Sequence, residues 1–231
     1  MESKKAAILQ RIIEEYTKTA EPVGSKVLVD KYDLSVSPAT VRNCMVALEE
    51  EGYLTHPHTS AGRIPTEKAY RYYVANCMNE KSLAQKERSR MHESIGGEEE
   101  DHDRMRMLAR AVAELANAAV VVGFSPRDVY YTGLSFLFSQ PEFAEIASVT
   151  TLSEILDHLD EVMGQAADSM EGDFAVSIGS ENPFSDATSI ILIRTEIQER
   201  PRLFGILGPQ RMNYQRNIAL AREVQTLMQE L

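Results

Sequence analysis

The sequence predicts a helix between residues 37 and 52, with residues typical of a helix start at one end and of a helix end at the other. Ser37 stands directly before Pro38, the arrangement expected of an N-cap followed by proline at the first helical position. Gly52 is a natural C-terminal stop. Three apolar residues recur on one face at helical spacing: Val41, Met45 and Leu48. This face must be buried, so the neighbouring segments have to pack against it.

Two helices are predicted before this one. Residues 4–19 carry apolar side chains at three- and four-residue spacing with charges between them, which is typical of an amphipathic helix. The turn at 21–24 contains proline and glycine and ends that helix. Ser25 can cap a short helix from Lys26 to about Tyr32.

A hairpin and a further helix are predicted after Gly52. Two short strand-like runs, 53–55 and 63–65, flank the polar loop 56–62, and Thr66 caps the next helix. The order is therefore helix, helix, helix, hairpin, helix. That is the layout of a winged helix-turn-helix, which we expect over residues 1–79.

The remainder of the chain divides into a polar segment and an α+β region. Residues 80–103 contain a Gly-Gly pair and end in an acidic run, so we expect a solvated acidic linker. Residues 104–231 mix helix and strand patterns and predict an α+β domain. Its expected helices lie at 104–117, 152–167 and 214–231, and its expected strands at 118–122, 174–178, 189–194 and 203–207.

The formal charge of −11 at first argues against a nucleic-acid partner, because phosphate binding favours a basic surface. Residues 1–80 hold 10 Lys and Arg against 11 Asp and Glu, whereas residues 81–231 hold 14 against 24. Nearly all of the acidity therefore lies in the C-terminal part. The first 80 residues must be judged by where their charges point.

Composition also restricts the compartment. The 2 cysteines are too few for a disulfide framework, which indicates a reducing environment. No apolar run approaches the roughly 18 residues that span a bilayer, and the N-terminus lacks the pattern of a signal peptide. We expect a cytoplasmic protein without a membrane partner.

The helix after Ser37 is the predicted DNA-reading element. In a helix-turn-helix the second helix lies in the major groove and reads base edges near its N-terminus. The outward positions of its first turns are Ala39, Thr40, Arg42 and Asn43. Arginine can pair bidentately with guanine and asparagine with adenine, and alanine or threonine can meet the thymine methyl group. Ser37 and Pro38 leave amide groups at the helix start that can face a phosphate.

A second set of residues is predicted to contact the DNA backbone. The loop between the strand-like runs supplies donors without negative charge: His58, Thr59, Ser60 and Arg63. Ser25 and Lys26, at the start of the preceding helix, complete the set. The alternative is a winged-helix fold that is used only for contacts with other proteins.

Several strings occur together in a specific combination: Pro22–Ser25, Ser37–Asn43, Leu48–Leu54, Pro57–Thr66 and Tyr70–Val74. The combination resembles the HrcA family, the bacterial heat-inducible transcription repressors, and the ten-residue string at 57–66 is its most specific part. Four segments of the C-terminal region are similar to the same family: 133–135, 141–143, 178–182 and 205–214. The resemblance covers nearly the whole chain, and residues 80–103 are its poorest part.

The resemblance implies a GAF-like second domain with a regulatory and dimerising role, a homodimer, and binding to an inverted-repeat operator in double-stranded DNA ahead of chaperone genes. It also implies that the GroEL chaperonin helps to keep the repressor active, and that stress diverts the chaperonin and lifts repression. The expected location is the bacterial nucleoid. Family members are usually longer, because a dimerising subdomain is inserted into the GAF-like domain. Here Val120–Pro126 passes almost directly to Tyr130–Leu134, so we expect that insert to be absent.

Other kinds of site have weaker support. His56 and His58 share a strand face, but no cysteine or acidic cluster lies nearby to complete a metal site. Cys44 and Cys77 lie on apolar helix faces and are expected to be small buried hydrophobic residues. No Gly-rich phosphate loop, nucleophile elbow or HExxH motif is present, so no catalytic or cofactor-binding residue is expected. The turn at Arg211 could hold an anion, although such turns are more often structural.

The sequence thus predicts a non-enzymatic, dimeric, sequence-specific repressor of heat-shock genes that uses no cofactor. A dimer is also expected on physical grounds, because reading an inverted repeat needs two heads. The alternative, from a different class, is a winged-helix and GAF-like module that senses a small molecule or a protein and binds no operator.

Overall fold

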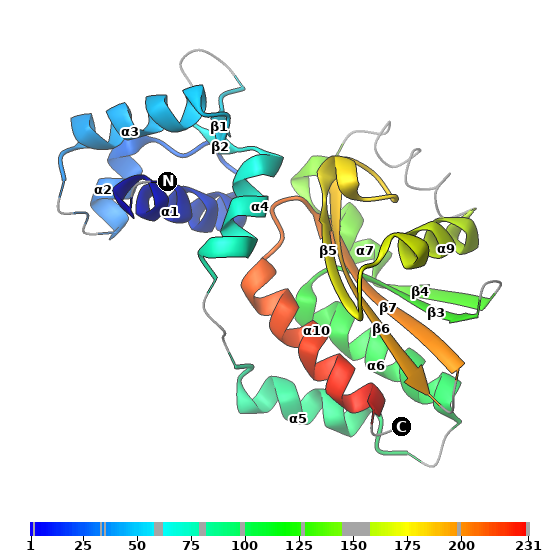
Figure 1. Ribbon diagram of the computed structural model, residues 1–231. Helices are drawn as coiled ribbons and strands as arrows, with labels where there is room; N and C mark the ends of the chain where they lie inside the picture. The colour runs from blue at the N-terminus through cyan, green and yellow to red at the C-terminus, as the bar shows by residue number, and fades with distance from the viewer. Residues whose placement is uncertain are drawn as a thin grey trace. The chain divides into compact units, whose positions relative to one another are not determined.

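The chain forms two compact units, Met1–Asn79 and Glu80–Leu231, in a computed structural model. The structure describes residues 1, 3–32, 34, 36–57, 62–78, 82–97, 100–125, 128–144, 158–197 and 200–229. Helices and antiparallel strands occur together, so the fold class is α+β, as the sequence predicts. Figure 1 shows the elements of each unit.

The first unit contains four helices and a two-stranded antiparallel ribbon within its described residues. The elements in chain order are α1 (Ser3–Thr19), α2 (Ser25–Tyr32), α3 (Pro38–Glu50), β1 (Leu54–Thr55), β2 (Ile64–Pro65) and α4 (Glu67–Asn76). Each of them was predicted from the sequence, and the starts and ends agree to within about two residues. The predicted order of helix, helix, helix, hairpin and helix is confirmed.

The apolar faces of these helices form one core. Ile12 of α1, Leu28 of α2 and Leu48 of α3 are fully buried, and Tyr70 of α4 is 1% exposed. Burying an aliphatic side chain of this size stabilises the fold by about 1.5–3 kcal/mol. The orientation of α3 therefore follows from its own apolar stripe.

The hairpin is held against the segment between α1 and α2. Val23 and Arg63 exchange two backbone hydrogen bonds, each 2.9 Å between nitrogen and oxygen. Gly62 lies so close to this segment that a Cβ atom there would come within 2.6 Å of the carbonyl carbon of Val23. A glycine is therefore required at position 62 by the close approach of two backbones.

Replacing Gly62 with alanine should destabilise the first unit by about 1–3 kcal/mol, because the backbone contact must be pushed apart. The measurement is urea unfolding of the full chain, followed through the NMR amide signals of α1 and α3. Gly24→Ala is the matched control, since a Cβ atom at Gly24 meets no heavy atom within 4 Å. Equal stability of the two variants would contradict the proposed contact.

The second unit is built on a five-stranded antiparallel sheet in the order β4-β3-β7-β6-β5. Its strands are β3 (Ala119–Ser125), β4 (Asp128–Thr132), β5 (Phe174–Ile178), β6 (Thr188–Ile197) and β7 (Arg200–Pro209). Its helices are α5 (Gln85–Ser94), α6 (Asp101–Ala116), α7 (Leu134–Phe138), α9 (Leu159–Ser169) and α10 (Tyr214–Gln229), with short 3-10 turns η1 (Pro141–Phe143) and η2 (Gly179–Glu181). The expected strand at 174–178 is confirmed with the same bounds, and the other three predicted strands are present but longer.

Helices pack on both faces of the sheet. On one face, Val121 of β3 and Leu192 of β6 belong to an apolar cluster with Met163 of α9 and Phe143 of η1. Side chains alternate along a strand, so the even-numbered residues of β3 and the odd-numbered residues of β6 point to the other face. There α6 packs along β3 and α10 along β6 (Figure 1).

The prediction of a solvated linker at 80–103 is wrong for most of the described residues in that range. α5 lies within it, and the side chain of Met91 is fully buried. Ion pairs join this helix to α10: Arg88 lies 3.1 Å and His92 3.0 Å from the two carboxylate oxygens of Glu223. The polar composition suggested a solvated segment, but a single apolar side chain with several ion pairs is enough to hold α5 on the unit. The acidic run also ends inside α6, which begins at Asp101 rather than Arg104.

Two other expectations for this unit depend on segments that the structure describes only in part. The helix expected near 152–167 is α9 from Leu159 onward, and residues 152–157 lie outside the described residues. The second expectation is that no subdomain is inserted between Val120–Pro126 and Tyr130–Leu134. β3 and β4 pair there as antiparallel neighbours, and residues 126 and 127 between them lie outside the described residues.

None of the described helices combines the length and the apolarity that crossing a membrane requires.

Candidate nucleic-acid interface

The start of α3 is fixed by its cap. Ser37 has an extended backbone, and its Oγ accepts a hydrogen bond from the amide of Thr40 at 3.2 Å. The hydroxyl of Thr40 lies 3.0 Å from the same Oγ. Pro38 occupies the first turn, as the sequence predicts. The cap is confirmed, and it sets the direction in which the first turns of α3 present their side chains.

The predicted outward face of α3 is exposed. Ala39, Arg42 and Asn43 are exposed and Thr40 is half-buried, whereas Val41 is fully buried on the opposite side. Within the described residues, the side chains of Arg42 and Asn43 make no hydrogen bond or ion pair. A guanidinium and a carboxamide therefore stand side by side on one surface without protein partners there. Such groups can meet the hydrogen-bonding edges of bases.

Three of the predicted backbone contacts cannot be placed. His58, Thr59 and Ser60 lie outside the described residues. Arg63 is described and half-buried, and its Nε lies 2.8 Å from Oε2 of Glu49 near the end of α3. His56 pairs with the other oxygen of the same carboxylate through Nδ1. Glu49 thus ties the residue after β1 and the residue before β2 to α3.

The C-terminal end of α3 is held by two lysines. Nζ of Lys5 in α1 lies 2.6 Å from a carboxylate oxygen of Glu51. Nζ of Lys68 in α4 donates to the backbone carbonyl of the same residue at 2.7 Å. Together with the contacts of Glu49, these pairs engage two of the three acidic residues at this end. Their charge is partly balanced within the unit rather than presented to a ligand.

α2 carries the remaining predicted contacts. Ser25 is half-buried at its first position and Lys26 is exposed beside it. The far end of α2 is bound to α1 through Glu15, a buried carboxylate that accepts hydrogen bonds from Lys31 and, at 3.0 Å, from the hydroxyl of Tyr32. The bond from Lys31 holds the pKa of Glu15 below its usual value of 4.5. Burial, reinforced by the bond to Glu15, raises the pKa of Tyr32 to about 12.

Several positioning residues were not predicted from the sequence. Val23 was assigned to a turn, although an apolar β-branched residue before glycine is compatible with a one-residue strand, and it is 2% exposed. The partners of Glu49 and Glu51 come from distant segments and give no local sequence signal. The sequence therefore predicted the exposed face of α3, but not what holds the hairpin and the helix ends.

The weaker sites of the sequence analysis have structural roles. Arg211 forms an ion pair with Glu142, with 2.5 Å between Nε and Oε1, and donates to Gln140 at 2.8 Å. Cys44 and Cys77 are free thiols, and they are half-buried rather than buried as expected, because each lies at the margin of its apolar helix face. Partial burial raises the pKa of Cys77. In the described ranges, His, Cys, Asp and Glu side chains do not gather in groups of three that could hold a metal ion.

Comparison with known proteins decides the family. The family model described as HrcA protein C terminal domain matches residues 65–218, about two thirds of the chain. The chain belongs to the HrcA family. HrcA relatives support this assignment independently: the heat-inducible transcription repressor HrcA of Kineococcus radiotolerans is 43% identical over 123 residues, and that of Frankia casuarinae is 44% identical over 124 residues.

The match to these HrcA proteins is partial. It covers 53% and 54% of this chain and 36% and 37% of the two relatives, so the chain spans little more than a third of the length of the relatives it matches. A crystal structure described as that of a hypothetical protein superposes with a TM-score of 0.82 at 16% identity, over 100% of this chain and 98% of that one. This likeness shows that the fold occurs in a solved protein.

Glu15→Gln should destabilise the first unit by about 1–2 kcal/mol near neutral pH, because it removes charge-assisted hydrogen bonds to Lys31 and Tyr32. The native pKa of Glu15 is lowered, so its stabilisation is complete above the unfolded value of 4.5 and is lost as the pH falls through the native value. The difference in free energy of unfolding between wild type and Glu15→Gln should therefore become smaller as the pH falls. Urea unfolding at several pH values, followed through NMR signals of α1 and α2, measures it.

The matched control is Glu14→Gln. Glu14 pairs with Gln10 and Arg11 on the same helix, so its loss should cost less than about 1 kcal/mol. A difference between Glu15→Gln and wild type that widens as the pH falls would contradict the assigned contact.

Proposed function

We propose that the chain is a sequence-specific DNA-binding transcription repressor whose first unit is a winged helix-turn-helix. α2 and α3 form the helix pair, α3 enters the major groove, and the hairpin β1–β2 is the wing. The observation that carries this proposal is the exposed pair Arg42 and Asn43 on the first turns of a capped helix, without partners among the described residues.

The proposed contacts fall into two groups. Base edges are read by Ala39, Thr40, Arg42 and Asn43. Phosphates are contacted by Ser25, Lys26, the start of α3 at Ser37, and the wing residues His58, Thr59, Ser60 and Arg63. Arg63 has a second role, because its ion pair with Glu49 keeps the wing against α3.

The second unit is proposed to be a GAF-like domain with a regulatory and dimerising role. Its five-stranded antiparallel sheet with helices on both faces supports this assignment, as does the family match over residues 65–218. We propose a homodimer on an inverted-repeat operator ahead of chaperone genes, with a GroEL-type chaperonin as modulator. The support is the name of the relatives, heat-inducible transcription repressor.

A second candidate function is a sensor module that binds no operator. It is favoured by one observation, a cavity of about 210 Å³ within the second unit. The two candidates differ in a simple respect, since only the repressor binds an inverted repeat more tightly than scrambled DNA.

Arg42→Ala should weaken binding to the operator by about 1–3 kcal/mol and relax the preference at one base pair, because a bidentate contact to a base is lost. Fluorescence anisotropy of the full chain on the inverted repeat upstream of the chaperone genes, compared with a scrambled duplex, measures both effects. Binding of operator and scrambled DNA at wild-type strength would contradict the assignment of Arg42.

Lys26→Ala is the matched control for charge. It should weaken binding evenly across sequences and reduce the slope of log affinity against log salt by about 1, because a phosphate contact carries no sequence information. Lys86→Ala, an exposed lysine on α5, removes the same charge in the second unit and should leave the sequence preference unchanged. A loss of base preference in either lysine variant would mean that charge alone explains the Arg42 result.

A further inference from the structure

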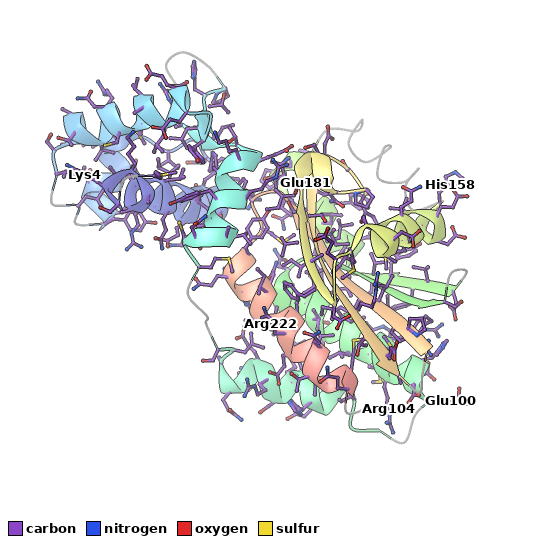
Figure 2. All side chains as sticks on the ribbon, in the orientation of Figure 1. Lys4, Glu100, Arg104, His158, Glu181 and Arg222 are labelled. Atoms are coloured by element: carbon purple, nitrogen blue, oxygen red, sulfur yellow. The ribbon has the colours of Figure 1, made fainter. Side chains whose placement is uncertain are left out.

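A cavity lies between α9 and the sheet of the second unit. Its volume is about 210 Å³. The sheet side is formed by β3, β7 and β6, where Gly123, Leu203 and Arg194 lie in one row of strand partners. Ser125 and Pro201 extend this floor toward the ends of their strands. His158, labelled in Figure 2, stands directly before α9 and locates the helix that forms the opposite wall.

Gly123 of β3 and Gly164 of α9 line the cavity from opposite sides. A Cβ atom at Gly123 would lie 3.4 Å from Cβ of Leu203 and 3.5 Å from Cε of Met163, so the free space lies on the side of Gly164. The lining residues of α9 recur on one helix face: Asp160, Met163, Gly164, Ala167 and Asp168. A Cβ atom at Gly164 would meet no heavy atom within 4 Å, so this position opens onto free space. The apolar cluster of the unit ends here, where Gly123 follows Val121 on the same face of β3.

Arg194 supplies the charged group at the floor. Its side chain is half-buried, and its Nη2 donates to the carbonyl of Ala167 in the last turn of α9, which uses one of five guanidinium N–H donors. The acidic lining residues are exposed, and Asp160 accepts the backbone amide of Glu161 in its own helix. Water screens exposed charges more than half-buried ones, so the guanidinium has the stronger electrostatic influence inside the cavity.

We propose that this cavity binds a small organic carboxylate with one ring or a short branched chain. The apolar part occupies the space between Gly123 and Gly164, and the carboxylate meets the guanidinium of Arg194. An apolar protein cavity of about 150 Å³ is large enough for benzene, so 210 Å³ accommodates one ring with a short substituent. Mostly apolar walls with a few placed polar groups are the usual composition of small-ligand sites. Here the charged lining residues are Arg194 on the sheet and Asp160 and Asp168 on α9. The site does not depend on DNA binding by the first unit.

The test uses two probes that share a ring and differ in charge, phenylacetate and phenethylamine. Isothermal titration calorimetry with the full chain should show saturable binding of phenylacetate and at least tenfold weaker binding of phenethylamine. Preference for the amine would overturn the role of Arg194, and the absence of saturable binding for both probes would overturn the site.

Gly164→Leu fills the cavity without removing a native contact, and leucine favours helix more than glycine does, so this variant is expected to fold. It should weaken phenylacetate binding at least tenfold. Gln165→Leu places the same side chain at the next position of α9, which does not line the cavity, and should bind as wild type does. Unchanged binding by Gly164→Leu, or an equal loss in Gln165→Leu, would show that the probe binds elsewhere.

Discussion

Burial of one face of α3 is the constraint on which the rest of the first unit depends. Val41 and Leu48 are fully buried and Met45 is 4% exposed. Rotating the helix about its axis would expose these side chains to water, and each would lose about 1.5–3 kcal/mol of burial free energy. The positions between them are then obliged to face outward. Arg42 and Asn43 are exposed for this reason, since no polar contact with another described residue orients their side chains.

The contacts around α3 act on its position and its ends. The cap at Ser37 fixes where the helix starts, and Glu49 and Glu51 bind the hairpin, α1 and α4 to its last turn. Because Glu49 and Glu51 pair with Arg63, His56 and Lys5, the charged side chains of the nearly neutral segment 1–80 are distributed unevenly. Arg42 and Asn43, which have no side-chain partner among the described residues, lie near the start of α3, and the paired acids Glu49 and Glu51 lie at its end.

The elements of the first unit could be predicted from the sequence because their signals are local. Caps, glycine stops and apolar spacing specify α1 to α4 and the hairpin. The contacts that assemble these elements could not be predicted, since the partners of Glu15 and Glu49 lie up to 17 residues away. In the second unit, α5 was not predicted because its sequence is polar and only Met91 is buried. β4 was not predicted because it is a short strand at the edge of the sheet, where the side chain of Tyr131 is 44% exposed. The cavity had no sequence signal, because its lining residues come from three strands and a helix that lie far apart in the sequence.

The central claim is that the first turns of α3 meet DNA bases. The most direct measurement is an NMR titration of the full chain with an operator duplex, observing the side-chain Nε–H of Arg42 and the side-chain amide of Asn43. The account predicts that both signals shift strongly with operator and weakly with a scrambled duplex of equal length. Signals that remain unchanged while the chain is saturated with operator would contradict it.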